Sequence, residues 1–387
     1  MGVSCFVLHR PVPADLRTEF EEKLAFCFER LRSCTLTDDG SAVELALDDD
    51  ADLPAATERI DTLARTMIDR HRTAERAIVF EHRVATRHRQ AIWDPMVAHG
   101  LIHAEGPGQV TFAGEAARVA LALDAHFARL AHDEFGAVDH QYPTMIEMDA
   151  LDRCHYFTSF PHHVTFAPHI RTDLEVIAAF SSATGRSRDR LDRTVAAPQH
   201  VLSPAVCFHT YLYFADRPLD GPHTITACGR CFRHEGKNFQ MAERLWDFSL
   251  REIVFVGPLG WVSERRQHGV DLCARLVADF GLDAWIETAN DPFFLDNFVA
   301  QRYFQRVQKT KLELQLGLPY SGQSLAAASF NAHLDFFGRS FGIRDGDGFA
   351  HTACIGFGIE RWTWALFAQL GPELADWPAH IRGTLSL

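Results

Sequence analysis

A run of charged and aromatic residues between positions 231 and 257 has the clearest chemistry in the sequence. Arg233 and Glu235 follow one apolar run, and Arg244 and Phe248 lie between a polar loop and a second apolar run. Two apolar runs joined by a charged loop predict a long β-hairpin. An arginine on a rigid strand suits bidentate contact with phosphate oxygens, and an aromatic ring can stack on a purine. The hairpin therefore favours a nucleotide ligand.

The alternative is an ordinary hairpin whose charges face water. That alternative accounts for Lys237 and Asn238 in the loop. It accounts poorly for two arginines and two glutamates, Glu235 and Glu252, in one register. We therefore prefer a functional role for the hairpin.

Positions 232–248 resemble motif 2 of class II aminoacyl-tRNA synthetases, in which F-R-x-E is followed by a loop and R-x-x-x-F. Positions 356–362, GFGIERW, resemble motif 3, G-x-G-x-E-R, whose glycines allow a tight turn from strand to helix. A helix expected at 116–133, followed by a strand with Pro143, resembles motif 1, through which these enzymes form homodimers. The resemblance implies an α+β fold with an antiparallel sheet flanked by helices.

The same resemblance implies roles in ATP binding. Arg233 would bind the α-phosphate, Arg361 the γ-phosphate, and Phe248 would stack on adenine, while Glu235 and Arg244 would help to hold the nucleotide. An adenylation transition state spreads negative charge over phosphates, so fixed cations lower its barrier.

Two cysteines and a glutamate, Cys207, Glu252 and Cys354, are each expected on a strand of the catalytic sheet. Each cysteine alone is more simply a small buried residue. Together they would give a zinc ion three ligands and leave one position open for an amino group. This set resembles the zinc-dependent seryl-tRNA synthetases of methanogens.

Several segments within residues 85–387 resemble a group related to those enzymes, the amino acid:[carrier protein] ligases. The segments are Tyr156–His162, Cys231–Glu235, Leu250–Ile253, Asp291–Phe294, Ser329–His333 with Asp335 and Gly338, and Ala350–Cys354. The resemblance implies that an amino acid is activated with ATP and passed to the phosphopantetheine thiol of a carrier protein, without tRNA. Glycine or alanine is the expected amino acid, with Ser329 and Asn331 binding it.

Two departures from the synthetase pattern concern magnesium and specificity. Ser324 stands where synthetases place a magnesium-binding glutamate. We expect Glu313 to bind magnesium in place of that glutamate. The hairpin loop, with Phe239, Met241 and Trp246, differs from the family pattern, which leaves the choice of amino acid open.

Composition supports an enzyme of the cytosol. The 387 residues are 47% apolar and 23% charged. The net charge of −13 argues against a surface that binds nucleic acid. Nine irregularly spaced cysteines are typical of reduced thiols. The sequence shows neither a run of membrane-spanning length nor a signal-peptide pattern, so we expect a cytoplasmic protein without membrane contact.

Residues 1–82 are expected to form a small α+β unit of their own. Its pattern is a strand at 3–8, a helix with Leu16 to Leu31 on one face, a strand at 43–47, a helix from Pro54 and a strand at 77–81. Through Gln90 it has 17 acidic and 13 basic residues, so we interpret it as a docking or packing module.

Residues 83–387 are expected to form the catalytic unit. Its helices are expected at 116–133, with Leu121 on the inner face, and at 173–183 and 262–280. A strand interrupted by Pro143 is expected at 140–146, and further strands at 202–214, as a pair carrying Cys207, and at 309–316, 323–337 and 351–358.

Two weaker metal-like motifs are discounted. Cys228 and Cys231 lack a second ligand pair and would point to opposite faces of a strand. His162 and His163 lack a carboxylate or cysteine at ligand spacing.

Two other functions remain as alternatives. A seryl-type tRNA aminoacylating enzyme would need a basic RNA-binding surface. A non-catalytic paralogue would have no need to keep Arg233, Glu235, Arg361 and the three metal-ligand candidates.

Overall fold

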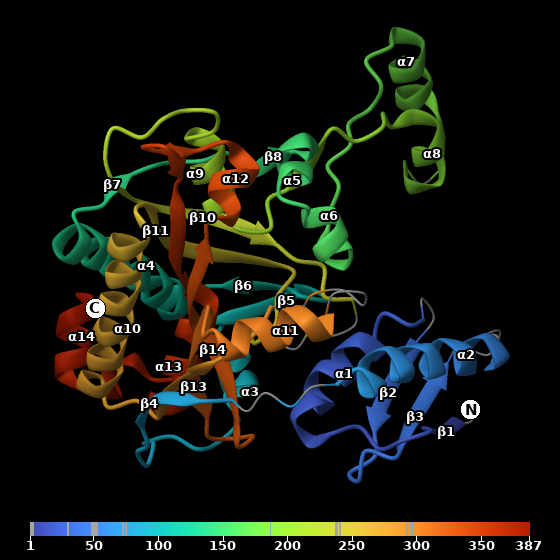
Figure 1. Cartoon of the computed structure of the whole chain (residues 1–387). Helices are drawn as coiled ribbons and strands as arrows, with labels where there is room; N and C mark the ends of the chain where they lie inside the picture. Colours follow the sequence, from blue (N-terminus) through green and yellow to red (C-terminus); the bar gives the residue numbers. More distant parts are fainter. Residues whose placement is uncertain are drawn as a thin grey trace.

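An eight-stranded sheet forms the centre of the protein (Figure 1). The computed structural model describes residues 4–28, 31–47, 53–71, 73, 76–185, 187–236, 239, 241–291, 293 and 298–387. The strand order is β4-β12-β13-β14-β17-β11-β10-β7, and every neighbouring pair is antiparallel except β10 and β7. The strands are β4 (Ile78–His82), β7 (Val138–Asp139), β10 (His223–Phe232), β11 (Asp247–Gly257), β12 (Ala284–Thr288), β13 (Lys311–Leu318), β14 (Gln323–Leu334) and β17 (His351–Gly358). The expected α+β fold with an antiparallel sheet is confirmed.

Helices cover both faces of this sheet. One face packs against α4 (Gly114–Phe135), α10 (Leu259–Asp279) and α13 (Ile359–Leu370), and the other against α9 (Cys207–Tyr213) and α12 (Phe336–Phe341). Alternate residues of a strand face opposite sides, so Ile355 of β17 joins the first core and Cys354 joins the second. The second face carries the functional side chains described below.

The described residues between 4 and 71 form a smaller unit, shown in blue in Figure 1, with its own sheet and core. Its sheet has the order β1-β3-β2. The elements are β1 (Ser4–Val7), η1 (Ala14–Leu16), α1 (Arg17–Leu24), β2 (Leu31–Leu36), β3 (Ala42–Leu47), α2 (Leu53–Ala64) and a π-helical turn, η2 (Arg65–Asp69). We call residues 4–71 the N-terminal unit.

Two expectations for this unit are wrong. The first helix ends at Leu24, and Leu31 begins β2 instead of extending the helical face. The strand expected at 77–81 is β4, which pairs with β12 at the edge of the large sheet. We therefore propose a domain boundary between positions 71 and 78, before the expected boundary at 82.

Most helices and strands expected in the catalytic unit are confirmed, and four expectations need correction, of which the last, at 140–146, is described in the next paragraph. The strand pair expected at 202–214 is wrong, because β9 (His200–Leu202) ends where this segment begins and α9 follows at Cys207–Tyr213. A helix buried on several sides lacks the periodicity that separates helix from strand in a sequence. Leu121 on α4 is 72% exposed and does not face the core. Strand β14 ends at Leu334, and α12 follows it.

Shorter elements complete the chain. They are α3 (Trp93–Ala98), β5 (Ile102–Gly106), β6 (Gln109–Phe112), β8 (Met145–Glu147), α5 (Met148–Arg153), α6 (Tyr156–Ser159), η3 (Pro161–His163), α7 (Leu174–Ser182), η4 (Ser187–Arg190), α8 (Leu191–Thr194), β9 (His200–Leu202), α11 (Phe298–Val307), β15 (Arg344–Asp345), β16 (Gly348–Phe349), η6 (Leu374–Asp376) and α14 (Ala379–Leu385). The strand expected at 140–146 is wrong for most of its length, because residues 140–144 are irregular and only β8 (Met145–Glu147) follows them.

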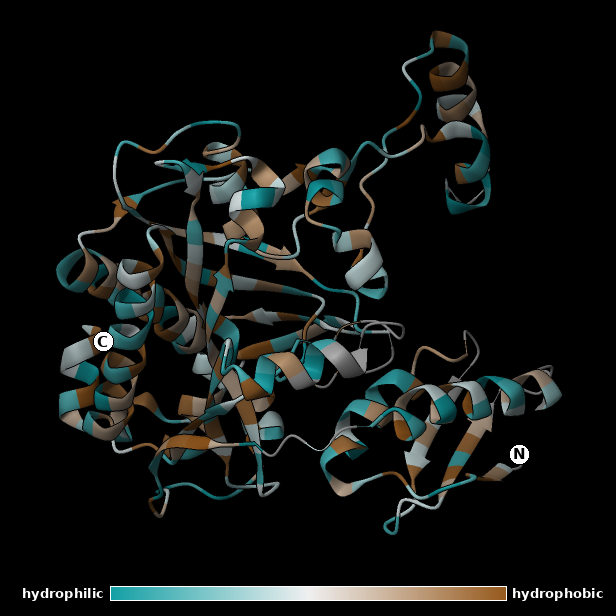
Figure 2. Cartoon of the chain, in the orientation of Figure 1, coloured by the Kyte–Doolittle hydropathy of each residue, from teal (hydrophilic) through white to brown (hydrophobic). Residues whose placement is uncertain are grey.

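Helices α7 and α8 project from the body of the molecule as an arm (Figure 1). Asp173 caps α7 by accepting hydrogen bonds from the backbone N–H groups of Glu175 and Val176. No residue of α7 is buried, although Figure 2 shows hydrophobic positions on it. Across the described part of the chain, none of the helices has the length and apolar content needed to span a membrane.

Candidate active site

A cavity of about 260 Å³ opens on the second face of the large sheet. Its walls come from strands β11, β13, β14 and β17 of that sheet, the first turn of α13 and the segment that holds Tyr156 and His163. Most site residues predicted from the sequence line it, namely Cys207, Arg233, Glu235, Phe248, Glu252, Ser329, Asn331, Cys354 and Arg361. Arg244 does not belong to the lining that the described residues form.

Strand pairing explains how distant positions meet in this cavity. Gly356 of β17 pairs with Glu252 of β11 on one side and with Ser329 of β14 on the other. A Cβ atom at position 356 would lie 3.3 Å from the Ser329 hydroxyl and 3.8 Å from the Glu252 side chain. A glycine at the centre of three strands therefore keeps the floor of the cavity open.

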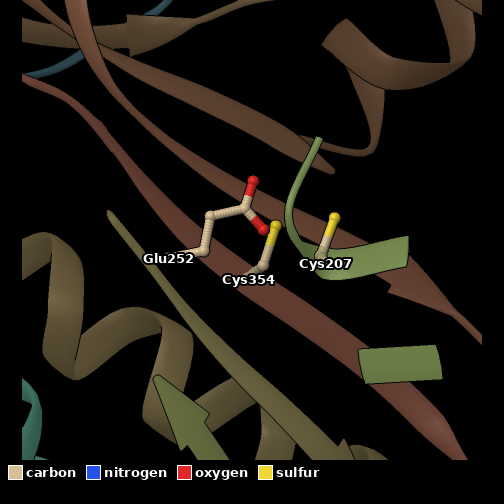
Figure 3. Close-up of side chains that lie close together, drawn as sticks. All are labelled: Cys207, Glu252 and Cys354. Atoms are coloured by element: carbon tan, nitrogen blue, oxygen red, sulfur yellow. The ribbon is translucent and has the colours of Figure 1, made fainter. Parts of the chain in front are cut away.

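Cys207, Glu252 and Cys354 form one buried cluster. One ligand atom of each lies within 4.8 Å of the others, and the side chains converge from α9, β11 and β17 (Figure 3). Two sulfurs and a carboxylate at these separations match the ligand preferences of zinc. The expected positions of Glu252 and Cys354 are confirmed, whereas Cys207 lies on a helix and not on a strand.

The electrostatics of the cluster also fit a cation. Burial, with the charge of Cys354, raises the pKa of Glu252 to about 8. The hydrogen bond between the two thiols, together with burial, raises the pKa of Cys207 well above its usual range. The same hydrogen bond lowers the pKa of Cys354 well below its usual range in spite of burial. The Glu252 Oε2 atom has no hydrogen-bond partner among the described residues. Three acidic groups in one buried place are stabilised in their charged forms by a divalent cation.

Two polar side chains of β14 surround the sulfur of Cys354. Asn331 Nδ2 lies 3.5 Å from it and His333 Nε2 lies 3.8 Å from it. The Nδ1 atom of His333 is 3.3 Å from the Tyr211 hydroxyl. The sequence prediction missed His333 and Tyr211 as neighbours of the cluster, although His333 ends the segment that resembles the ligases.

Arg233 and Phe248 face each other across the hairpin. The Arg233 guanidinium carbon is 5.6 Å from the centre of the Phe248 ring, and Arg233 Nε donates to the Pro204 carbonyl over 3.0 Å. The paired register of β10 and β11 places Phe248 opposite Cys231. Arg233 and Phe248 thus lie on the same wall of the cavity, as we predicted from the sequence of the hairpin.

Arg361 lies in the first turn of α13 and is held by two carbonyls. It donates to the Glu243 and Ala326 carbonyls, each over 3.0 Å. The adjacent Glu360 accepts from the Ser249 backbone N–H over 2.8 Å and from Arg230 over 3.1 Å, so it ties α13 to β11. These contacts fix the direction of the arginine before any ligand binds.

Arg244 points to a different partner. Its Nη2 atom lies 2.5 Å from a carboxylate oxygen of Glu22 on α1, and its Nη1 lies 3.5 Å from Glu235. The loop positions Lys237 and Asn238 lie outside the described residues. The structure therefore brings nine of the predicted site residues to the cavity and places the tenth at its edge.

Several carboxylates line the cavity near the expected magnesium position. Glu313 is within 3.0 Å of Lys311 Nζ, which also lies 2.7 Å from Asp291. Lys311 and the neighbouring charges lower the pKa of Asp291 in spite of its burial. Ser324 donates to Gln315 over 3.1 Å and does not belong to the described lining. The sequence did not single out Lys311 or Glu243, which lack a motif. Of the segment 291–294, positions 292 and 294 lie outside the described residues.

The two weaker motifs do not form metal clusters among the described residues. Cys231 is buried beside Val206 and Ala227, whereas Cys228 is partly exposed on the same strand. His163 lines the cavity with Nε2 at 3.8 Å from Glu235, and His162 contacts Phe26.

Comparison with solved structures confirms the fold. The structure of M. kandleri SerRS in complex with A. aeolicus tRNASec matches 99% of this chain and 77% of its own, with a TM-score of 0.73 and 19% identity. Seryl-tRNA synthetase from Pyrococcus horikoshii, complexed with ATP, matches 78% of this chain and 64% of its own, with a TM-score of 0.57 and 15% identity. The chain has the class II synthetase fold.

Comparison with curated sequences is more specific. No protein-family model matches the chain. Amino acid–[acyl-carrier-protein] ligase 1 of Bradyrhizobium diazoefficiens is 32% identical over 307 residues, which are 76% of this chain and 91% of the relative. The type-2 serine–tRNA ligase of Methanothermobacter thermautotrophicus is 25% identical over 286 residues, 71% of this chain and 56% of the relative. The chain therefore belongs to the family of amino acid–[acyl-carrier-protein] ligases, enzymes on the class II synthetase fold.

Proposed function

We propose that this enzyme activates a small amino acid with ATP and transfers it to the phosphopantetheine thiol of a carrier protein. One observation carries the proposal, namely that the buried Cys207, Glu252 and Cys354 cluster lies in the same cavity as Arg233 and Arg361. The names of the related ligases support the carrier-protein acceptor.

The first step joins the amino acid to AMP. An oxygen of the amino-acid carboxylate attacks the α-phosphorus of ATP, and pyrophosphate leaves. Arg233 stabilises the charge at the α-phosphate, Arg361 binds the γ-phosphate, and Phe248 stacks on adenine. A zinc ion held by the Cys207, Glu252 and Cys354 cluster would offer its open position to the α-amino group. Magnesium accompanies ATP, and we propose that Glu313 is one of its ligands.

The second step transfers the aminoacyl group. The sulfur of the phosphopantetheine thiol attacks the activated carbonyl carbon, the thiol proton passes to water, and the bond from that carbon to the phosphate oxygen breaks, so that AMP leaves. Arg233 keeps the adenylate phosphate in place during this attack because its guanidinium is already fixed to the Pro204 carbonyl.

The lining beside the cluster supports a small amino acid, glycine or alanine. Asn331, His333 and Phe337 occupy the wall next to Cys354. These three side chains restrict the space for the side chain of an amino acid whose amino group is bound at the Cys207, Glu252 and Cys354 cluster. Ser329 and Asn331 are the proposed contacts to the amino acid.

The alternative acceptor is tRNA, as in the seryl-tRNA synthetases that share the fold. Binding of tRNA is dominated by phosphate contacts and needs a basic surface. The net charge of −13 argues against it, and so does the excess of acidic residues through Gln90. A non-catalytic paralogue is disfavoured because the motif arginines and the cluster all reach one cavity.

An assay of both half-reactions tests the proposal. Exchange of pyrophosphate into ATP with a panel of amino acids identifies the substrate. Intact-mass spectrometry should then show an aminoacyl group on a carrier protein, released by hydroxylamine, and the Arg233→Ala variant should lose both signals. The carrier protein without phosphopantetheine is the matched control and should stay unmodified. Efficient charging of bulk tRNA with no mass shift on any phosphopantetheinylated carrier would overturn the proposal.

A further inference from the structure

The N-terminal unit touches the catalytic unit at the edge of the cavity. The Phe26 ring, just after α1, meets the His162 ring edge-on at 5.0 Å. It also packs on Gly236, where an added Cβ would lie 2.9 Å from the Phe26 ring. Gly236 directly follows Glu235 in the loop of the central hairpin. The unit therefore contacts the direct sequence neighbours of Glu235 and His163, two residues that line the cavity.

A second contact anchors the same helix. Arg302 and Arg306 of α11 have side chains that are 2% and 1% exposed. Arg306 lies 2.7 Å from Glu19 of α1, and Arg302 lies 3.1 Å from Asp15. Buried arginines need such partners, because an unpaired buried charge is strongly destabilising. The position of α1 against the cavity is thus specified by buried ion pairs.

These anchors bring a carboxylate to the arginine expected to bind ATP. Glu22 lies 2.5 Å from Arg244, and Glu235 approaches the same guanidinium from the other side at 3.5 Å. In this arrangement Arg244 stays out of the described cavity lining. A phosphate group would need the same N–H donors that Glu22 occupies, and the Glu22 carboxylate would repel it.

We propose that Glu22 is a positioning residue that holds Arg244 away from the cavity until the triphosphate of ATP displaces it. The inference rests on the proposed activation of an amino acid by ATP. The contact is reciprocal, so ATP that takes Arg244 from Glu22 weakens the attachment of α1. The N-terminal unit is then part of the nucleotide site and responds to its occupancy.

Kinetics of pyrophosphate exchange test the proposal. Glu22→Gln keeps the shape of the side chain and removes its charge, so the KM for ATP should fall about fivefold or more, with a smaller change in kcat. Glu58→Gln removes an exposed carboxylate from the same unit and should leave the KM unchanged. In an Arg244→Ala background the Glu22→Gln change should have no further effect. An unchanged or higher KM in Glu22→Gln would overturn the inference.

Hydrogen exchange of the unaltered protein provides an independent test. Amides of 17–24 should exchange faster with saturating ATP than without it, whereas slower or equal exchange would contradict the displacement of Glu22. If the unaltered protein shows no ATP–pyrophosphate exchange with any amino acid, the proposed function fails. If the unaltered protein is active and Glu22→Gln behaves like it, only the further inference fails.

Discussion

Arg251 on β11 and Asp124 on α4 form a two-point ion pair, with Nε at 2.7 Å from Oδ1 and Nη2 at 2.9 Å from Oδ2. Arg251 directly precedes Glu252, and the two side chains point to opposite faces of the sheet. The pair therefore fixes the strand that carries the glutamate of the proposed metal site against the long helix α4.

Replacing Asp124 by asparagine should lower the free energy of unfolding by about 2 kcal/mol, because the partly buried arginine loses a charged hydrogen-bond partner. Chemical denaturation followed by circular dichroism measures the change. Asp133→Asn alters an exposed carboxylate of the same helix and should have little effect. Equal stabilities of the two variants would show that the ion pair contributes nothing measurable.

The purified protein should hold about one zinc ion per chain. Cys207→Ser and Cys354→Ser should each lose the metal and amino-acid activation, since each removes one of three protein ligands. Elemental analysis of the proteins after gel filtration gives the metal content. Cys228→Ser, on β10 outside the cluster, should keep its zinc. Stoichiometric zinc in Cys354→Ser would rule out this site.

The chain should form a homodimer through α4 and the segment around Pro143. Leu121 of α4 and Val138 of β7 are large apolar residues that are 72% and 59% exposed in the single chain. Leu121→Glu should therefore shift the mass from light scattering toward the monomer, whereas Leu174→Glu on the α7–α8 arm should not. A mass near 43.5 kDa for the unaltered protein at micromolar concentration would contradict the dimer.

Lys23 should make stability depend on pH in the alkaline range. Burial lowers its pKa to about 8 in spite of the nearby carboxylates of Glu22 and Glu235, whereas an unfolded lysine titrates near 10.4. Between these values the unfolded state binds more protons, so stability rises with pH. Lys23→Met should be more stable than the unaltered protein at pH 7, with a gap that narrows from pH 8 to about 10.4. Denaturation curves at several pH values measure the gap, and a constant gap would contradict the buried charge.

The central hairpin and the third motif could be predicted from the sequence because their signals are local. Two apolar runs joined by a charged loop mark β10 and β11, and two glycines before Arg361 mark the turn into α13. The cluster could be predicted only as a set of residues, through the resemblance to known enzymes. Its geometry depends on strand pairing between β11 and β17, which local patterns do not encode.

The misjudged elements lacked such local signals. Cys207, Phe208 and Tyr211 are all buried, so α9 shows no polar face that would distinguish it from a strand. Strand β4 leaves Ile78 and Val79 exposed at a sheet edge, and its partner β12 lies far along the chain. The contact between Glu22 and Arg244 likewise joins two units that a sequence pattern treats separately.

The buried arginines of α11 also have a consequence for evolution. Arg302 and Arg306 are neutralised by Asp15 and Glu19, which belong to the N-terminal unit. A homologue without that unit would expose two cations beside its active site with no carboxylates to pair them. Positions 302 and 306 should therefore carry arginine only in lineages that retain the N-terminal unit. Positions 15, 19, 302 and 306 should change together when the N-terminal unit is gained or lost.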